Sequence, residues 1–263
     1  MRLKVKGSET YVATGGKPFD ASLPTLVFLH GSGLDHRTWA LQTRWFAFRG
    51  WSVVAPDLPG HSLSRGRPLT SIEKMADWTW HLLDALGVTN ASLIGHSQGA
   101  LVALEAAARQ SERSTSLSLI ATGGAIPVNP QLLDTAKTNR PAAVDAMLTW
   151  GFGESYQFGK SDVPGQAPLA IGNRIMCANP LEIDLQACQN YTNGENAANK
   201  VSCPTQLILA LNDRMTPLKA GRQLATQLPN VKNVAEIDAG HMLPIEAPEN
   251  CLNELRNFIT ALD

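Results

Sequence analysis

Ser97, which stands between two glycines, is a candidate nucleophile. It lies in the pentapeptide GHSQG at positions 95–99, after the apolar run ASLI and before the helix-favouring segment 98–109. A strand, a tight turn and a helix in this order would hold the hydroxyl above the carboxyl edge of a sheet. Such a turn is crowded, so it needs flanking glycines, and the helix N-terminus adds partial positive charge where an oxyanion would form. Ser97 could instead serve only as the cap of that helix.

A serine hydroxyl needs a general base near neutral pH, and His241 has the position that suits one. It follows the last strand-like run, in AGHMLP at positions 239–244, and precedes the final helical pattern. The remaining histidines lie outside such a late strand end: His30, His36, His61, His81 and His96. His241 could also be an ordinary hydrogen-bonded loop residue.

The base in turn needs a carboxylate to orient it, and Asp213 is the candidate. It lies in LNDRMTP at positions 211–217, directly after a buried-type strand. Parallel strands bring such ends to one edge of the sheet, and the chain order serine, aspartate, histidine fits this arrangement. Asp213 could instead cap a helix or pair with Arg214. Glu236 and Asp238 are rival acids, but they belong to a strand pattern before the turn.

Two backbone N–H groups would be needed to bind the oxyanion. The Gly-rich segment HGSG at positions 30–33 follows the first buried strand, and we expect the N–H of Ser32 to act with that of Gln98. Gly-rich loops also bind phosphate, but no P-loop lysine pattern and no G-x-G-x-x-G motif occurs in the sequence.

The elements that must position these residues are visible as short apolar runs alternating with helical patterns. The strand-like runs are 25–30, 52–55, 91–95, 116–120, 205–209 and 234–237, preceded by a weaker pair at 3–6 and 11–13. The helical patterns are 71–86, 98–109, 217–228 and 248–262. Runs without polar alternation suit strands buried on both faces, so we expect an α/β fold with a mostly parallel sheet covered by helices on both faces.

One stretch interrupts this alternation. Residues 125–201 contain helical pieces but no convincing strand. They are therefore expected to form a helical cap inserted into a core domain made of residues 1–124 and 202–263.

With these motifs in place, the sequence resembles the α/β-hydrolase family. The matching segments are LHGSGLDHRTW, PDLPGHS, GHSQG, LNDRMTP and AGHMLPIEAPE, in that order along nearly the whole chain. The resemblance implies an eight-stranded sheet with a cap after the sixth strand. Related haloalkane dehalogenases and epoxide hydrolases carry Asp where this chain has Ser97. The meta-cleavage carbon–carbon hydrolases usually carry Trp where Met242 stands, and Pro-Gly where Leu34 and Asp35 stand, which counts against that activity.

The expected reaction is hydrolysis of a small carboxylic ester or lactone through an acyl-enzyme. The alternatives are carbon–carbon bond hydrolysis and a non-catalytic receptor on the same fold. Several apolar residues are expected to line a substrate pocket, or else to pack the cap: Met147, Trp150, Phe152, Tyr156, Phe158, Met176 and Met242. Arg174 could hold a substrate carboxylate, or could instead be solvated or paired in a salt bridge.

Composition excludes several other classes of function. The 263 residues carry a formal net charge of -1, which gives no general attraction to nucleic acid or anionic lipid. No run of about 18 apolar residues and no secretory h-region occurs, so no membrane span is expected and the cytoplasm is the expected location. The four cysteines lack metal-ligand spacing, and we expect neither a metal nor another cofactor. The sequence leaves the oligomeric state open.

Overall fold

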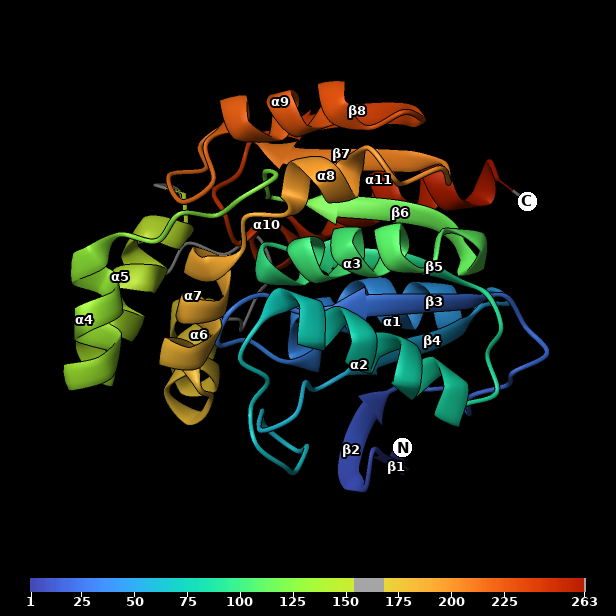
Figure 1. Cartoon of the computed structure of the whole chain (residues 1–263), viewed down its shortest axis with the longest axis horizontal. Coiled ribbons are helices and arrows are strands. Elements are labelled where there is room, and N and C mark those ends of the chain that lie inside the picture. Colours follow the sequence, from blue (N-terminus) through green and yellow to red (C-terminus); the bar gives the residue numbers. More distant parts are fainter. Residues whose placement is uncertain (154–167, 263) are drawn as a thin grey trace.

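The computed structural model describes residues 1–153 and 168–262, and they form one eight-stranded sheet between layers of helices (Figure 1). The strand order is β1-β2-β4-β3-β5-β6-β7-β8. Strand β2 pairs antiparallel with both β1 and β4, and the remaining neighbours pair parallel, which confirms the predicted fold class. The strands are β1 (Arg2–Val5), β2 (Ser8–Ala13), β3 (Thr25–Leu29), β4 (Ser52–Pro56), β5 (Ala91–His96), β6 (Ser114–Ile120), β7 (Thr205–Ala210) and β8 (Val231–Ile237).

Strand burial explains which strands the sequence predicts well. Every residue of β3, β4 and β7 is buried, as expected for strands covered on both faces. The last strand, β8, lies at the sheet edge with alternating burial, and it begins three residues before the predicted run at 234–237. Its first residues, Val231, Lys232 and Asn233, lack the apolar run that marks a buried strand.

The helices among the described residues are α1 (Ala40–Ala47), α2 (Ile72–Ala85), α3 (Gln98–Arg109), α4 (Pro130–Thr138), α5 (Arg140–Gly151), α6 (Pro168–Ala178), α7 (Leu181–Asn190), α8 (Gly194–Ala198), α9 (Leu218–Gln227), α10 (Leu243–Glu246) and α11 (Pro248–Thr260). Local signals set their ends. The side chain of Ser71 caps α2 by accepting from the N–H of Lys74, and Gly87 follows the helix with a φ of +71°. Within the described ranges, no helix is long and apolar enough to cross a bilayer.

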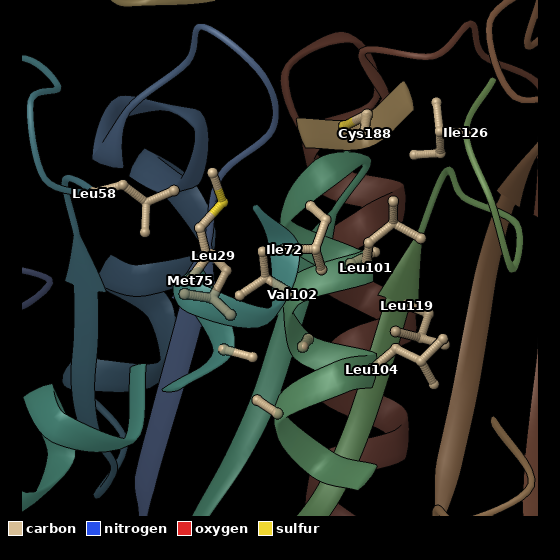
Figure 2. Packing of buried hydrophobic residues seen from close by; sticks show 14 of the residues in the cluster. Leu29, Leu58, Ile72, Met75, Leu101, Val102, Leu104, Leu119, Ile126 and Cys188 are labelled. Carbon is tan, nitrogen blue, oxygen red and sulfur yellow. The ribbon is translucent and has the colours of Figure 1, made fainter. Parts of the chain in front are cut away.

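Two apolar cores lie on opposite faces of the sheet. In β3, Leu26 and Phe28 join a cluster with residues of α1 and α11, whereas Val27 and Leu29 join the cluster under α2 and α3. Figure 2 shows part of the second cluster, where the following side chains approach one another: Leu29, Ile72, Met75, Leu101, Val102, Leu104 and Leu119. Apolar packing thus stabilises the sheet on both faces, and this fixes the position of its carboxyl edge.

Helices α4 to α8 lie between β6 and β7 in the chain, where the sequence analysis expects the insertion. Helices α4, α5, α6 and α7 group at one end of the molecule in Figure 1, beyond the carboxyl ends of the parallel strands. Helix α8 differs, because it packs against α3 and α9 over the sheet.

Candidate active site

Ser97 occupies the turn between β5 and α3 in a strained backbone conformation. Its φ of 55° and ψ of -119° lie in a region that a residue with a side chain rarely adopts. A Cβ atom on Gly95 would overlap the carbonyl oxygen of Gly99, and one on Gly99 would overlap the carbonyl oxygen of Leu29. Both glycines are therefore required by close backbone packing, which holds the Ser97 hydroxyl at the carboxyl edge of the sheet.

The structure brings Ser97, His241 and Asp213 into one hydrogen-bonded series. The distance from His241 Nε2 to Ser97 Oγ is 2.8 Å, and the distance from His241 Nδ1 to Asp213 Oδ2 is also 2.8 Å. The three residues are buried, with exposed fractions of 7% for Ser97, 2% for His241 and 8% for Asp213. A buried series in this order lets the imidazole take a proton from the hydroxyl while the carboxylate faces the other ring nitrogen.

The Asp213 carboxylate is held in place by the turn that follows it. Its Oδ1 accepts from the N–H groups of Met215 and Thr216, each at 2.8 Å, and its Oδ2 accepts from the Thr216 hydroxyl at 2.7 Å. Burial alone would raise the pKa of Asp213, but His241 and the hydrogen bonds from Thr216 hold it below its usual value. This carboxyl group is therefore ionised where it faces His241.

The structure does not support an ion pair of Asp213 with Arg214, and the two rival acids, Glu236 and Asp238, contact other residues. Asp213 makes no ion pair with Arg214 in the described structure. Asp238 accepts from the Asn212 amide at 2.7 Å, and Glu236 pairs with Arg222.

His96, directly before Ser97, supports the loop of His241. The ring is fully buried, and its Nε2 donates to the backbone carbonyl of His241 at 2.8 Å. Burial, together with the neighbouring His241, lowers the pKa of His96 to about 3, so the ring is neutral. The sequence does not predict this role for His96, and its one signal is the position of the residue inside the serine pentapeptide.

The loop of Ser32 lies against Ser97. A Cβ atom on Gly31 would lie 3.3 Å from the Cβ of Ser97. The N–H of Ser32 has no acceptor among the described residues, and Gln98, as the first residue of α3, has no acceptor within its own helix. Both N–H groups expected from the sequence thus lie beside the turn of Ser97 without a competing partner in the described part of the protein.

A buried ion pair ties the inserted helices to this loop. His61 Nε2 contacts Asp184 Oδ2 at 2.9 Å, and the same oxygen accepts from the N–H of Gly33 at 2.7 Å. Asn179 adds a second link, since its amide donates to the carbonyls of Gly33 and Leu34 and accepts from the N–H of Ser62. No sequence motif indicates the roles of Asp184 and Asn179, because their contacts join segments more than 100 positions apart.

The His61 pair gives a pH-dependent contribution to stability. Burial would lower the pKa of His61, but Asp184 and the carbonyl of Pro59 raise it above the ordinary value of 6.5. A raised pKa in the folded state stabilises the protein fully below the ordinary value, and this contribution is lost as the pH rises through the raised one. We expect His61→Gln to lower the free energy of unfolding by roughly 3 kcal/mol near pH 6.

Urea unfolding between about pH 6 and pH 9 measures this effect. The difference in free energy of unfolding between wild type and His61→Gln should become smaller as the pH rises. The control is His81→Gln, because the side chain of His81 on α2 is outside this cluster. A gap that widens toward high pH would contradict the assignment of a charged imidazole.

Glu246 is a second buried acid that the sequence analysis missed. Its Oε1 accepts from the N–H groups of Gly240 and Gly153, each at 2.9 Å. The backbone of Met242 also donates to the carbonyl of Gly151 at 3.0 Å. The loop of His241 and the end of α5 are thus joined through one carboxyl group, which stands five positions after the histidine.

A cavity of about 340 Å3 borders Ser97 and His241. Its walls come from the strand-end loops and from the inserted segment: Ser32, Ser97, Ile126, Pro127, Val128, Asn129, Leu132, Met147, Trp150, Leu185, Cys188, Arg214, Met215 and His241. Nine of these fourteen residues are apolar or weakly polar, so the cavity suits a small, largely apolar molecule.

The structure separates the pocket residues expected from the sequence into three groups. Trp150 and Met147 line the cavity. Phe152, Met176 and Met242 belong to the apolar core instead, with exposed fractions of 1%, 0% and 1%, and are not part of the lining. Phe158 and Tyr156 lie outside the described residues. Arg174 is exposed on α6 and does not line the cavity.

One group of potential metal ligands occurs among the described residues, formed by Asp35, His36 and Asp57, whose ligand atoms lie within 4.8 Å of one another. Each carboxylate already has partners. Asp35 pairs with Arg37, and Asp57 accepts from the backbone and ring of His36 and from the N–H of Leu63. These contacts explain, without a metal, why the three residues lie close together: they hold the loop after β3 in place.

A mostly parallel eight-stranded sheet, with a glycine-flanked serine in the turn after its fifth strand, defines the α/β-hydrolase class. The chain belongs to the alpha/beta hydrolase family, whose model matches residues 26–254. It is similar to a pimeloyl-(acyl-carrier protein) methyl ester esterase of Aromatoleum aromaticum, with 30% identity over 246 residues that cover 87% of this chain and 95% of that protein.

Another relative is the magnesium-chelatase 30 kDa subunit of Rhodobacter capsulatus, with 29% identity over 235 residues, 84% of this chain and 81% of that protein. Among solved structures, the enol-lactonase from Burkholderia xenovorans LB400 matches with a TM-score of 0.88 and 23% identity, covering 99% of this chain and 100% of that one. These similarities confirm the family and the fold expected from the sequence motifs.

Proposed function

We propose that this protein hydrolyses small carboxylic esters or lactones through an acyl-enzyme on Ser97. The observation that carries the proposal is the buried series from Ser97 Oγ through His241 to Asp213, with both contacts at 2.8 Å. The esterase from Aromatoleum aromaticum supports an ester as the substrate class. Helices α4 to α7 would act as a cap over the site, within the inserted segment 125–201.

In the proposed reaction, the Ser97 oxygen attacks the carbonyl carbon while His241 Nε2 accepts the hydroxyl proton. The N–H groups of Ser32 and Gln98 donate to the oxyanion, each being worth about 3 kcal/mol in the transition state. His241 returns the proton to the leaving alkoxide, and a water deprotonated by His241 then releases the acid. Asp213 stabilises the imidazolium in both steps, and no cofactor is required.

Two measurements test the proposal. A series of alkyl esters and lactones of increasing size should include substrates that the purified protein hydrolyses. A fluorophosphonate should phosphonylate Ser97, with loss of fluoride, and mass mapping should locate the adduct. A protein that neither turns over any member of the series nor forms the adduct would instead be a binding protein on the same fold.

A further inference from the structure

We propose that Arg214 binds a carboxylate of the substrate, so that the preferred substrates are esters or lactones with an anionic group remote from the scissile bond. This inference rests on the proposed function, since it names the substrate class of the same site.

Arg214 is the only residue with a permanent charge among the described residues that line the cavity. No carboxylate belongs to that part of the lining. The guanidinium also has no ion pair or side-chain hydrogen bond to any described residue, whereas Arg109, Arg113 and Arg222 pair with carboxylates. A cation that no described residue pairs with, on a wall whose other described residues carry no permanent charge, is available to a ligand.

The neighbouring carboxylate does not neutralise this cation. Asp213 is the adjacent residue, but its oxygens are directed to His241, Thr216 and the N–H of Met215. These bonds also fix the backbone of the turn on both sides of Arg214. Arg214 therefore belongs to a turn held by hydrogen bonds, and the carboxylate of that turn, Asp213, is bonded to other groups. Because the turn is already ordered, less entropy is lost when a ligand binds.

Two polar residues of the cavity lining, Ser97 and Arg214, differ in burial. Ser97 is 7% exposed, whereas Arg214 lies on the exposed side of its turn. The scissile carbonyl would therefore lie inside and the anion near the opening, with apolar walls such as Met147, Trp150 and Leu185 for the connecting chain. A single guanidinium matches the charge and the planar geometry of one carboxylate, whereas a dianionic phosphate would call for more cations than this wall supplies.

The test compares monomethyl and dimethyl esters of straight-chain dicarboxylic acids, which differ only in the remote charge. Wild type should prefer the monoanion, and Arg214→Gln should lower kcat/KM for it about tenfold while changing kcat/KM for the dimethyl ester less than twofold. Arg214→Lys should keep part of the preference. Raising the ionic strength from about 0.02 to about 0.5 M should narrow the preference in wild type only.

The matched control is Arg174→Gln, because this exposed arginine of the inserted segment does not line the cavity. The inference is overturned by equal turnover of both esters in wild type, by an equal loss for both esters in Arg214→Gln, or by loss of preference in Arg174→Gln. In each of these results ester hydrolysis continues, so the proposed function stands.

A second measurement applies even where methyl esters are slow substrates. Straight-chain dicarboxylates should slow the labelling of Ser97 by a fluorophosphonate in wild type, and Arg214→Gln should remove at least most of that protection. Labelling that is equally fast with and without dicarboxylate in wild type argues against the carboxylate site. Failure of labelling itself would count against the proposed function.

Discussion

Replacing Ser97 by alanine is expected to lower kcat by a factor on the order of 10⁶ for every ester or lactone that the wild-type protein hydrolyses. The hydroxyl is the atom that would bond to the substrate, and no other hydroxyl contacts His241 Nε2 in the described structure. The substitution removes one oxygen from a turn whose backbone is held by the close packing of Gly95 and Gly99. The fold should therefore persist, and urea unfolding would check this.

The matched control for this variant is Ser92→Ala, at the opposite end of the same strand. Ser92 contacts the hydroxyls of Thr115 and Ser116, far along β5 from the turn. It should retain nearly full activity. If Ser97→Ala kept most of its activity, another group would have to be the nucleophile and the proposed mechanism would be wrong.

Replacing Asp213 by asparagine is expected to lower kcat by about 10⁴. The reason lies in the turn after the aspartate. The amide oxygen of the new side chain would stay on the N–H groups of Met215 and Thr216, because Oδ1 already accepts from both. Its NH2 group would then face His241 Nδ1, which would have to accept a hydrogen bond. That tautomer carries its proton on Nε2 and cannot take one from Ser97.

Steady-state kinetics with a single good substrate would measure this loss, and Asp238→Asn serves as the control. Asp238 is exposed and accepts from Asn212, so its conversion to an amide should change kcat less than twofold. Similar losses in the two variants would indicate that the acid of the series had been assigned wrongly.

The sequence predicts the central strands well, because strands buried on both faces need uninterrupted apolar residues. It predicts less about elements stabilised by contacts with distant segments. Helix α1 has no side-chain cap and starts from a short 3-10 turn, so no local pattern marks it. The start of β8 is equally unmarked, because an edge strand does not require an apolar run.

The same distinction applies to the site. Each residue of the series stands in a short motif at a strand end: Ser97, Asp213 and His241. The motifs and their order in the chain were therefore enough to predict that the three residues lie close together. The cavity walls had no such signal. Phe152, a buried core residue, and Trp150, a lining residue, are both aromatic side chains near the end of α5, and only the packing distinguishes them.

The ion pair of His61 and Asp184 has a consequence for redesign of the protein. The inserted segment 125–201 supplies nine of the fourteen residues that line the cavity. Asp184 and Asn179 attach this segment to the loop of Ser32, in addition to apolar packing. A chimera that exchanges residues 125–201 for the equivalent segment of a relative could transfer substrate preference without altering the sheet. It would need to carry an acid and an amide at these two places, or the graft would leave the loop beside the serine without its anchors.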